Sequence, residues 1–285
     1  MSLDWCRHCG GHEQMTVEHL PPRGTGNKSE VTLYREESGG GFTALAPFAD
    51  GHALPTLCYQ CNNGASERGL PQAYIAWHED VVSQVQQYAT GYHQVTGGSL
   101  DGFWSYKASD GSAKMLPLEH GRGADPDKMT NLHPGRIVRQ VLGGFLAVQD
   151  NRRLLDDYPQ LVKAYFADEP ASIAPFSLHV ALTDTGLTYQ PAGSMMVTID
   201  RRTGRSTSSD FWVLVFPPFL ICLVRGDEAP TAATRIDHWF DQPVKATFSR
   251  QGRNVSYPIA LRGDLLVEKL HRDRERLIAD NPDLH

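Results

Sequence analysis

The sequence predicts an α+β protein in three parts: a small cysteine-rich module over residues 1–70, a mainly helical region over 71–170, and a β-rich, mostly antiparallel domain over 171–285 that ends in a helix. Three observations lead to this division. Four of the five cysteines lie in two Cys-x-x-Cys pairs within the first part. Apolar residues recur at helical spacing through the second part. Beyond residue 170 they gather in short runs separated by turn residues, which is typical of strands.

In the first part, short apolar runs predict strands at residues 17–20 and 54–57, and a β-prone segment at 31–34. Residues 35–53 are expected to be an inserted loop, because this stretch is longer than a minimal module needs. Two prolines directly after the first strand end it.

In the second part, Tyr74, Trp77 and Val81 begin an apolar stripe that predicts a helix over 71–88. Similar stripes predict helices over 133–149, where Pro134 suits the first turn, and over 159–167. The Gly143-Gly144 pair weakens the 133–149 helix or lets another segment approach it closely. A hairpin is expected over 103–118, around the turn dipeptide Asp110-Gly111.

The third part contains β-prone runs at 176–183, 195–199, 211–216 and 219–224. The runs at 244–249 and 255–261 flank Gln251-Gly252 and predict a hairpin. A charged helix is expected over 264–279.

The two cysteine pairs are Cys6/Cys9 and Cys58/Cys61. Each pair can place two thiolates on one ion, and together they supply the four soft ligands of a closed tetrahedral zinc site. The N-terminus lacks the charged and apolar regions of a signal peptide, which favours zinc over the alternative of disulfides. Cys222 lies alone in an apolar run and is expected to be an inert core residue.

An acid–histidine pair, Glu18-His19, lies between the two cysteine pairs, and Asn62 directly follows the second pair. Carboxylate, amide oxygen and imidazole favour harder or borderline ions than thiolates do. The two sets of residues therefore suit two different metals, one structural and one catalytic. Asn63 is adjacent and is an alternative to Asn62.

Together these motifs resemble the zinc-knuckle subgroup of the ββα-metal (HNH) endonucleases. The family pattern is Cys-x-x-Cys, an Asp/Glu-His pair, then Cys-x-x-Cys followed by His or Asn. The resemblance covers residues 1–70 and implies a ββα-metal zinc module with metal-dependent nuclease activity. By position, it implies that His19 is the general base and that Glu18 and Asn62 hold a catalytic Mg²⁺ or Mn²⁺.

The implied chemistry is metal-assisted hydrolysis of a phosphodiester. A water must lose a proton as it attacks phosphorus, and neutral imidazole has a suitable basicity near neutral pH. A divalent cation stabilises the negative charge that builds on the leaving 3′-oxygen.

The sequence departs from the family pattern in two ways. The family has a middle Asn in the strand before the second knuckle, which holds the base histidine through backbone hydrogen bonds; residues 51–57 contain no Asn here. His52 is the candidate replacement, and if it does not serve, the role is lost. Glu18 stands where Asp is commoner, which keeps the charge and lengthens the side chain.

Charge and hydropathy limit the binding partners and the cellular location that the sequence predicts. The net charge of −6 argues against a broad nucleic-acid surface, so contact with DNA, the expected partner, must use local basic patches or the metal. A homodimer or another protein partner stays open. No stretch approaches the roughly 20 apolar residues of a membrane span, which together with the N-terminus predicts a cytoplasmic protein without a membrane partner.

Two other functions remain open. The chain could be a catalytically silent zinc-bound module that binds nucleic acid or protein, an alternative that the missing middle Asn and the acidic charge favour. It could also be a zinc-ribbon scaffold on a protein of unrelated activity, although the C-terminal region contains no nucleophile constellation, phosphate loop or carboxylate pair to support that.

Overall fold

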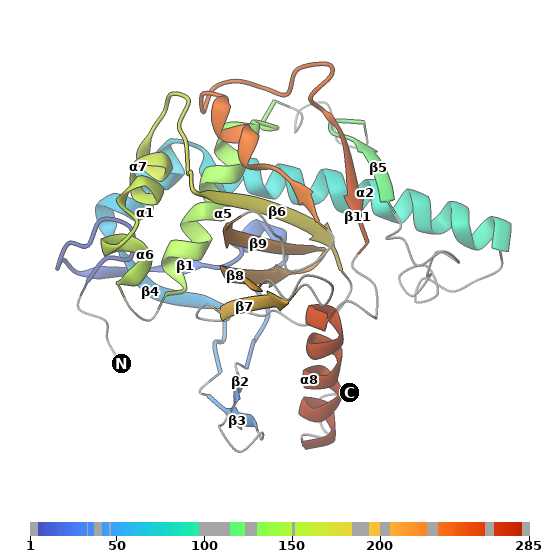
Figure 1. Ribbon diagram of the computed structural model, residues 1–285, viewed down its shortest axis with the longest axis horizontal. Helices are drawn as coiled ribbons and strands as arrows, with labels where there is room; N and C mark the ends of the chain where they lie inside the picture. The colour runs from blue at the N-terminus through green and yellow to red at the C-terminus, as the bar shows by residue number, and fades with distance from the viewer. Residues whose placement is uncertain are drawn as a thin grey trace.

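The structure is a computed structural model that describes residues 5–32, 34–36, 42–45, 47–96, 115–122, 130–149, 152–183, 194–199, 206–226, 233–259 and 265–280. Within these residues it is a mixed α and β protein whose sheets pair antiparallel, as the sequence predicts (Figure 1). The finer division into three domains stays a prediction.

The N-terminal module is built from two strands and a helix. Strand β1 (Met15–His19) pairs antiparallel with β4 (Ala53–Cys58), and helix α1 (Tyr59–Glu67) follows β4 directly. The register shifts between Thr16 and Glu18, where Pro55 and Thr56 of β4 lie opposite the single residue Val17, which marks a bulge in β4. Both strands begin and end within two residues of the predicted bounds.

The connection between β1 and β4 is more ordered than the sequence predicts. It contains the turn η1 (Arg23–Thr25) and a hairpin of β2 (Tyr34–Glu36) and β3 (Phe42–Ala44). The expectation of a plain loop over 35–53 is therefore wrong. Of the described residues in the β-prone run at 31–34, Val31 forms an isolated bridge with Phe48 and Tyr34 begins β2.

Helices α2 (Leu70–Thr96) and α5 (Pro134–Ala147) lie against each other in the middle of the molecule (Figure 1). Helix α2 continues eight residues past its predicted end, and α5 is buried along almost its whole length. The shorter helices α6 (Arg153–Asp156) and α7 (Pro159–Phe166) follow. A Cβ on Gly143 of α5 would lie 2.8 Å from the Tyr165 ring, which confirms that this glycine lets another segment approach closely.

The main sheet has the strand order β10-β6-β9-β8-β7 and is antiparallel throughout. Its strands are β6 (Phe176–Leu182), β7 (Ser194–Ile199), β8 (Ser206–Phe216), β9 (Phe219–Arg225) and β10 (Thr234–Arg235). The turn η2 (Asp237–Asp241) follows β10. One apolar face of the sheet packs on the helices, and the Trp77 ring of α2 stacks on Phe219 of β9 at 3.9 Å. Cys222 is buried in β9, as expected.

The hairpin predicted from the runs at 244–249 and 255–261 is wrong, whereas residues 103–114 of the hairpin predicted over 103–118 lie outside the described residues. Strand β5 (Met115–Glu119) pairs antiparallel with β11 (Asn254–Pro258), which is far away in the sequence. Residues 244–249 are not a strand, and the proposed turn at Asp110-Gly111 lies outside the described residues. Gln251-Gly252 forms a turn, but it leads into β11 from an irregular segment.

A buried polar network ties β5 and β11 to α2. His120 contacts the Asp80 carboxylate at 3.0 Å through Nδ1 and the Tyr257 hydroxyl at 2.7 Å through Nε2. Both side chains of the His120–Asp80 pair are inaccessible to solvent. Because each polar atom has a partner, the network fixes one packing of these three elements.

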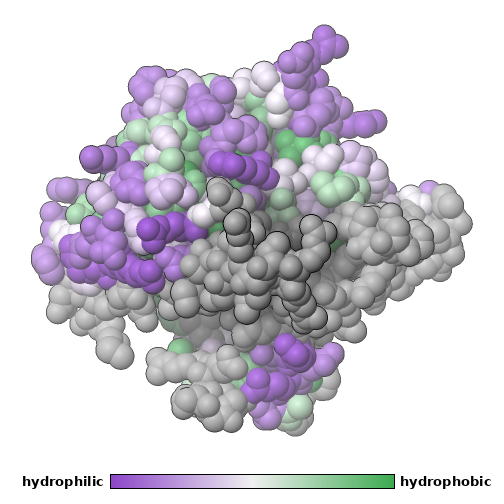
Figure 2. All heavy atoms as spheres, viewed as in Figure 1, coloured by the Kyte–Doolittle hydropathy of each residue, from purple (hydrophilic) through white to green (hydrophobic). Residues whose placement is uncertain are grey.

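One continuous apolar core contains residues from the N-terminal module, the helices and the sheet. The β2–β3 hairpin and the final helix α8 (Leu265–Asp280) project from one side of this body (Figure 1), where the Arg276 guanidinium lies 5.2 Å above the Phe42 ring. Hydrophilic side chains cover most of the coloured surface in Figure 2, with hydrophobic ones scattered between them. None of the helices in the described ranges is long and apolar enough to cross a membrane.

Candidate metal centre and the adjacent histidine

The four knuckle cysteines come together as the sequence predicts. The sulfur atoms of Cys6, Cys9, Cys58 and Cys61 all lie within 4.8 Å of one another, close enough to hold one metal ion. All four are free thiols, and only Cys9 is exposed. The first pair lies in the turn before β1, while the second lies at the junction of β4 and α1, so the β1–β4 pairing brings the pairs together.

The thiols affect one another's ionisation. A hydrogen bond from Cys61 lowers the pKa of Cys6 to about 4, against the opposing effect of burial. The same bond, together with burial, raises the pKa of Cys61, and burial raises that of Cys9. The Cys6 thiol therefore ionises readily, and its negative charge opposes ionisation of the neighbouring thiols. A bound cation is needed for several of the four cysteines to be thiolates at the same time.

The first knuckle is anchored in the core by His8. Its Nε2 lies 3.0 Å from the Gly143 carbonyl of α5, and its ring lies 4.3 Å from the Tyr165 ring of α7. Burial lowers the pKa of His8 to about 4, which keeps the ring neutral and makes it a donor to that carbonyl. His8 therefore serves packing, while the four sulfurs are the group that could hold a metal ion.

His19 is partly exposed at the end of β1, and its Nε2 lies 2.9 Å from the backbone carbonyl of Asp50. A carbonyl oxygen can only accept, so Nε2 carries the proton and donates it to this bond. In the neutral ring, Nδ1 then has a lone pair that is free to accept a proton. The contact thus fixes the tautomer that a general base requires.

The segment that presents the Asp50 carbonyl is clamped by Asn27, a residue that sequence reasoning missed. The Asn27 amide donates to the carbonyls of Pro21 (2.7 Å) and His52 (2.9 Å), and its oxygen accepts from the His52 N–H (2.6 Å). These bonds tie the segment after His19 to the segment before β4. Asn27 thereby holds both sides of this segment through backbone hydrogen bonds.

Gly51 is required at the centre of this clamp. Its φ of +83° is a left-handed conformation, and a Cβ there would lie 2.3 Å from the Asn27 carbonyl oxygen. The sequence signal was an Asn in a glycine-containing loop, but its partners are up to 25 residues away along the chain and no local pattern reveals them.

His52, the candidate replacement for the middle Asn, lies on the inner side of the clamp. It is buried, and its Nδ1 lies 2.7 Å from the Leu20 carbonyl, while the Leu20 N–H donates to the His52 carbonyl at 3.0 Å. His52 therefore fastens the residue directly after His19, and it shares with Asn27 the task of holding this segment.

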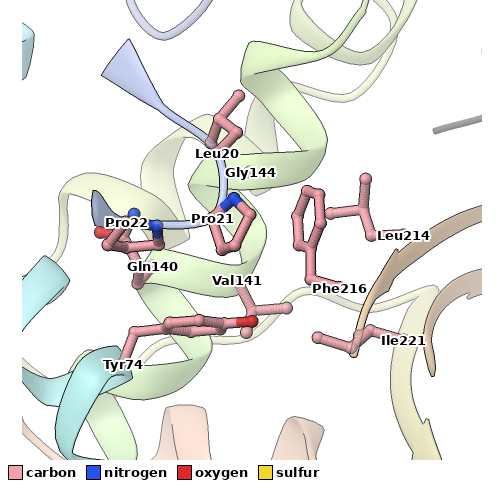
Figure 3. Close-up of a pocket in the computed structure, with 10 residues that line it drawn as sticks. All are labelled: Leu20, Pro21, Pro22, Tyr74, Gln140, Val141, Gly144, Leu214, Phe216 and Ile221. Atoms are coloured by element: carbon pink, nitrogen blue, oxygen red, sulfur yellow. The ribbon is translucent and has the colours of Figure 1, made fainter. Parts of the chain in front are cut away.

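Behind the clamp, Leu20, Pro21 and Pro22 pack over an apolar pocket lined by α2, α5, β8 and β9 (Figure 3). The cavity measures about 10 Å³, room for about one water molecule. The Tyr74 hydroxyl on α2 is buried and has no hydrogen-bond partner among the described residues, and burial raises its pKa above the usual range. The three residues after His19 thus pack against the apolar core formed by α2, α5, β8 and β9.

The Glu18 side chain points away from the side of β1 on which His19 contacts the Asp50 carbonyl. Successive strand residues point to opposite faces, and the Glu18 carboxyl accepts a hydrogen bond from Gln140 on α5. Burial raises the pKa of Glu18 to about 7, with the Gln140 bond opposing the shift. A carboxyl held in this way binds a proton near neutral pH, and a divalent cation would compete for the same oxygens.

Asn62 lies in the first turn of α1, and its side chain reaches back to β1. Its amide nitrogen donates to the Thr16 hydroxyl at 2.9 Å and to the Val17 carbonyl at 3.2 Å. The Val17 carbonyl belongs to the residue before Glu18, so Asn62 contacts the strand next to Glu18. The described contacts use only the nitrogen of Asn62, which leaves its amide oxygen for another partner.

The structure thus gathers the four cysteines, fastens His19 to Asp50, and brings Asn62 to the strand that carries Glu18. Among the described residues, the four cysteines are the one group of three or more His, Cys, Asp or Glu ligand atoms that lie this close together. A catalytic ion would therefore need ligands beyond these residue types.

Compared with protein-family models, with curated proteins and with solved structures, the chain matches none of them.

Proposed function

We propose that the chain is a metal-dependent endonuclease of the ββα-metal class that hydrolyses DNA phosphodiester bonds, with a structural zinc and a catalytic Mg²⁺ or Mn²⁺. The observation that carries the proposal is the tautomer of His19: Nε2 is committed to the Asp50 carbonyl, so Nδ1 is left as the base. The strand–strand–helix order of β1, β4 and α1 around the cysteine cluster adds to it.

Zinc fits the cysteine cluster. Zinc bonded to four sulfurs at about 2.3 Å needs sulfur–sulfur separations of roughly 3.8 Å, and the Cys9 and Cys58 sulfurs are 3.9 Å apart. A disulfide would need about 2.05 Å. With four protein ligands the site is closed, so its role would be to hold β4 and α1 against the turn before β1.

In the proposed mechanism, His19 Nδ1 takes the proton from a water as that water attacks phosphorus. The Asp50 carbonyl keeps the ring oriented and stabilises the imidazolium that forms. The amide oxygen of Asn62 and the carboxylate of Glu18 would hold the divalent ion, which supplies charge stabilisation for the leaving oxygen. Mg²⁺ commonly keeps several waters and takes few protein ligands, so two ligands are sufficient.

Plasmid nicking in the presence of Mg²⁺ or Mn²⁺ tests the proposal. Wild type is expected to nick, and His19→Ala to lose at least about a hundredfold in rate, the usual contribution of a general base, while its zinc content stays near one ion per chain. His238→Ala, at an exposed histidine of η2, is the matched control and should nick normally. Nicking that survives in His19→Ala would refute the base assignment.

The silent binding module is the second candidate, and the burial of Glu18 against Gln140 favours it. It predicts full zinc content and no nicking of any DNA or RNA form with any divalent ion. The nicking assay therefore separates the two functions.

A further inference from the structure

We infer that Arg23 grips the scissile phosphate beside His19, and that the Asp50 carboxylate holds the Arg23 guanidinium in readiness until a phosphate displaces it; this rests on the proposed function. The net charge of −6 repels the phosphates of a nucleic acid. A chain of that charge needs a local cation where the phosphate binds.

Arg23 and His19 are connected through one residue. The His19 ring donates to the Asp50 carbonyl at 2.9 Å, and the Arg23 NH2 group donates to the Asp50 carboxylate at 2.7 Å. The imidazole and the guanidinium therefore both contact Asp50, one through its backbone carbonyl and the other through its carboxylate. A phosphate at His19 would be within the reach of a long arginine side chain.

The Arg23–Asp50 ion pair is suited to exchange. The two side chains are 58% and 56% exposed, and an exposed pair of this kind is only weakly favourable. The pair uses one of the five guanidinium N–H donors. Arginine binds phosphate oxygens with two parallel N–H bonds, which is a stronger arrangement than the single bond to Asp50.

The backbone beneath Arg23 is fixed, so only the side chain has to move. Arg23 begins the turn η1, which is closed by the bond from the Gly26 N–H to the Arg23 carbonyl at 3.2 Å. A Cβ on Gly24 would lie 2.5 Å from the Ile75 side chain, so this turn packs directly on α2. Asn27 ties the preceding Pro21 carbonyl to the clamp.

Two other arginines near the module, Arg139 and Arg68, are committed to structural bonds. Arg139 is buried and donates to the carbonyls of Gly135, Ala167 and Glu169. Arg68 donates to the Asp168 carboxylate and to two carbonyls at the end of α7. Neither could turn to a phosphate without leaving buried acceptors unpaired.

Binding of a short fluorescein-labelled DNA duplex, measured by fluorescence anisotropy with Mg²⁺ in a His19→Ala background, tests the inference without cleavage. Arg23→Gln is expected to weaken binding about tenfold and to reduce the slope of log Kd against log salt by about one. Arg235→Gln is the matched control, because Arg235 is also exposed and paired with a nearby aspartate, and it should bind as the parent does.

Asp50→Asn supplies the opposite test. It keeps the backbone carbonyl that holds His19 but removes the anion that competes for Arg23, so binding should tighten severalfold. If the ion pair served only the fold, both Arg23→Gln and Asp50→Asn would weaken binding, and the inference would fall.

The outcomes separate this inference from the proposed nuclease function. If Arg23→Gln binds and nicks like wild type, the inference is wrong and the nuclease assignment stands. If binding depends on Arg23 but wild type never nicks, the contact of Arg23 with a phosphate stands, but that phosphate is not a scissile one and the nuclease assignment falls. If wild type binds no nucleic acid, both are wrong.

Discussion

At the scale of single residues, Glu18 and His19 show how one strand can carry two opposite environments. His19 reaches the Asp50 carbonyl, while the neighbouring Glu18 is partly buried and accepts a hydrogen bond from Gln140. Burying a carboxyl without a cation is costly, and here it raises the pKa of Glu18 from 4.5 to about 7. Such a cost is typical of functional sites, where a ligand offsets it.

The Glu18 pKa predicts a pH-dependent cost to stability when no Mg²⁺ or Mn²⁺ is added. Because the folded pKa lies above the unfolded one, the folded state binds the proton more tightly. The stabilisation is complete below about pH 4.5 and is lost as the pH rises to about 7. Glu18→Gln should therefore be more stable than wild type near pH 8, by about 1–3 kcal/mol.

Urea unfolding at about pH 4.5 and about pH 8 measures this difference. Near the lower pH the two proteins should have similar free energies of unfolding. Adding Mn²⁺ near pH 8 should stabilise wild type and not Glu18→Gln. An equal difference between the proteins at both pH values would show that Glu18 is not buried as described.

At the scale of elements, the segment between β1 and β4 determines where the His19 acceptor lies. Asn27 and His52 close the two ends of this segment, and Gly51 allows them to approach. The β2–β3 hairpin lies beyond this closure, so it can vary without disturbing His19.

Gly51→Ala should disturb the clamp more than a matched glycine change. Gly26 also has a positive φ, +93°, but a Cβ there would meet nothing within 4 Å. Gly26→Ala should therefore cost only the backbone strain, about 1–2 kcal/mol. Gly51→Ala adds a collision with Asn27 and should cost about 2 kcal/mol more.

Thermal unfolding and nicking rates of the two glycine variants test this comparison. Gly51→Ala should lower both the Tm and the nicking rate, with zinc retained, because the Asp50 carbonyl moves away from His19. If Gly51→Ala and Gly26→Ala lose equal stability and equal activity, the clamp does not position His19.

The sequence predicts elements well where the signal is local. The helix over 133–149 and the strands around 176–224 are confirmed, because apolar spacing and proline positions specify them directly. The partners of β5 and β11 were not predictable, because the turn at Gln251-Gly252 indicates a reversal but not which strand lies alongside. Asn27 and the Asp80–His120–Tyr257 network depend on contacts between distant segments, which no spacing rule contains.

At the scale of the whole molecule, the cysteine cluster shares one core with the helices and the main sheet. Cys6, Cys58 and Cys61 are buried in the same apolar cluster as Trp77 and Phe219. A metal bound by these cysteines would therefore support more than the N-terminal strands. The acidic net charge repels a phosphate from most of the surface. In the proposed function, Arg23 and a divalent ion would supply the local positive charge that attracts it.

The nicking rate of zinc-loaded protein as a function of added Mn²⁺ tests the central claim most directly, since the claim is that a second, harder cation works beside His19. The account predicts no nicking without added Mn²⁺, a rise to saturation as Mn²⁺ is added, and about one zinc per chain throughout. Full nicking without the added ion, or none at any Mn²⁺ concentration, would contradict it.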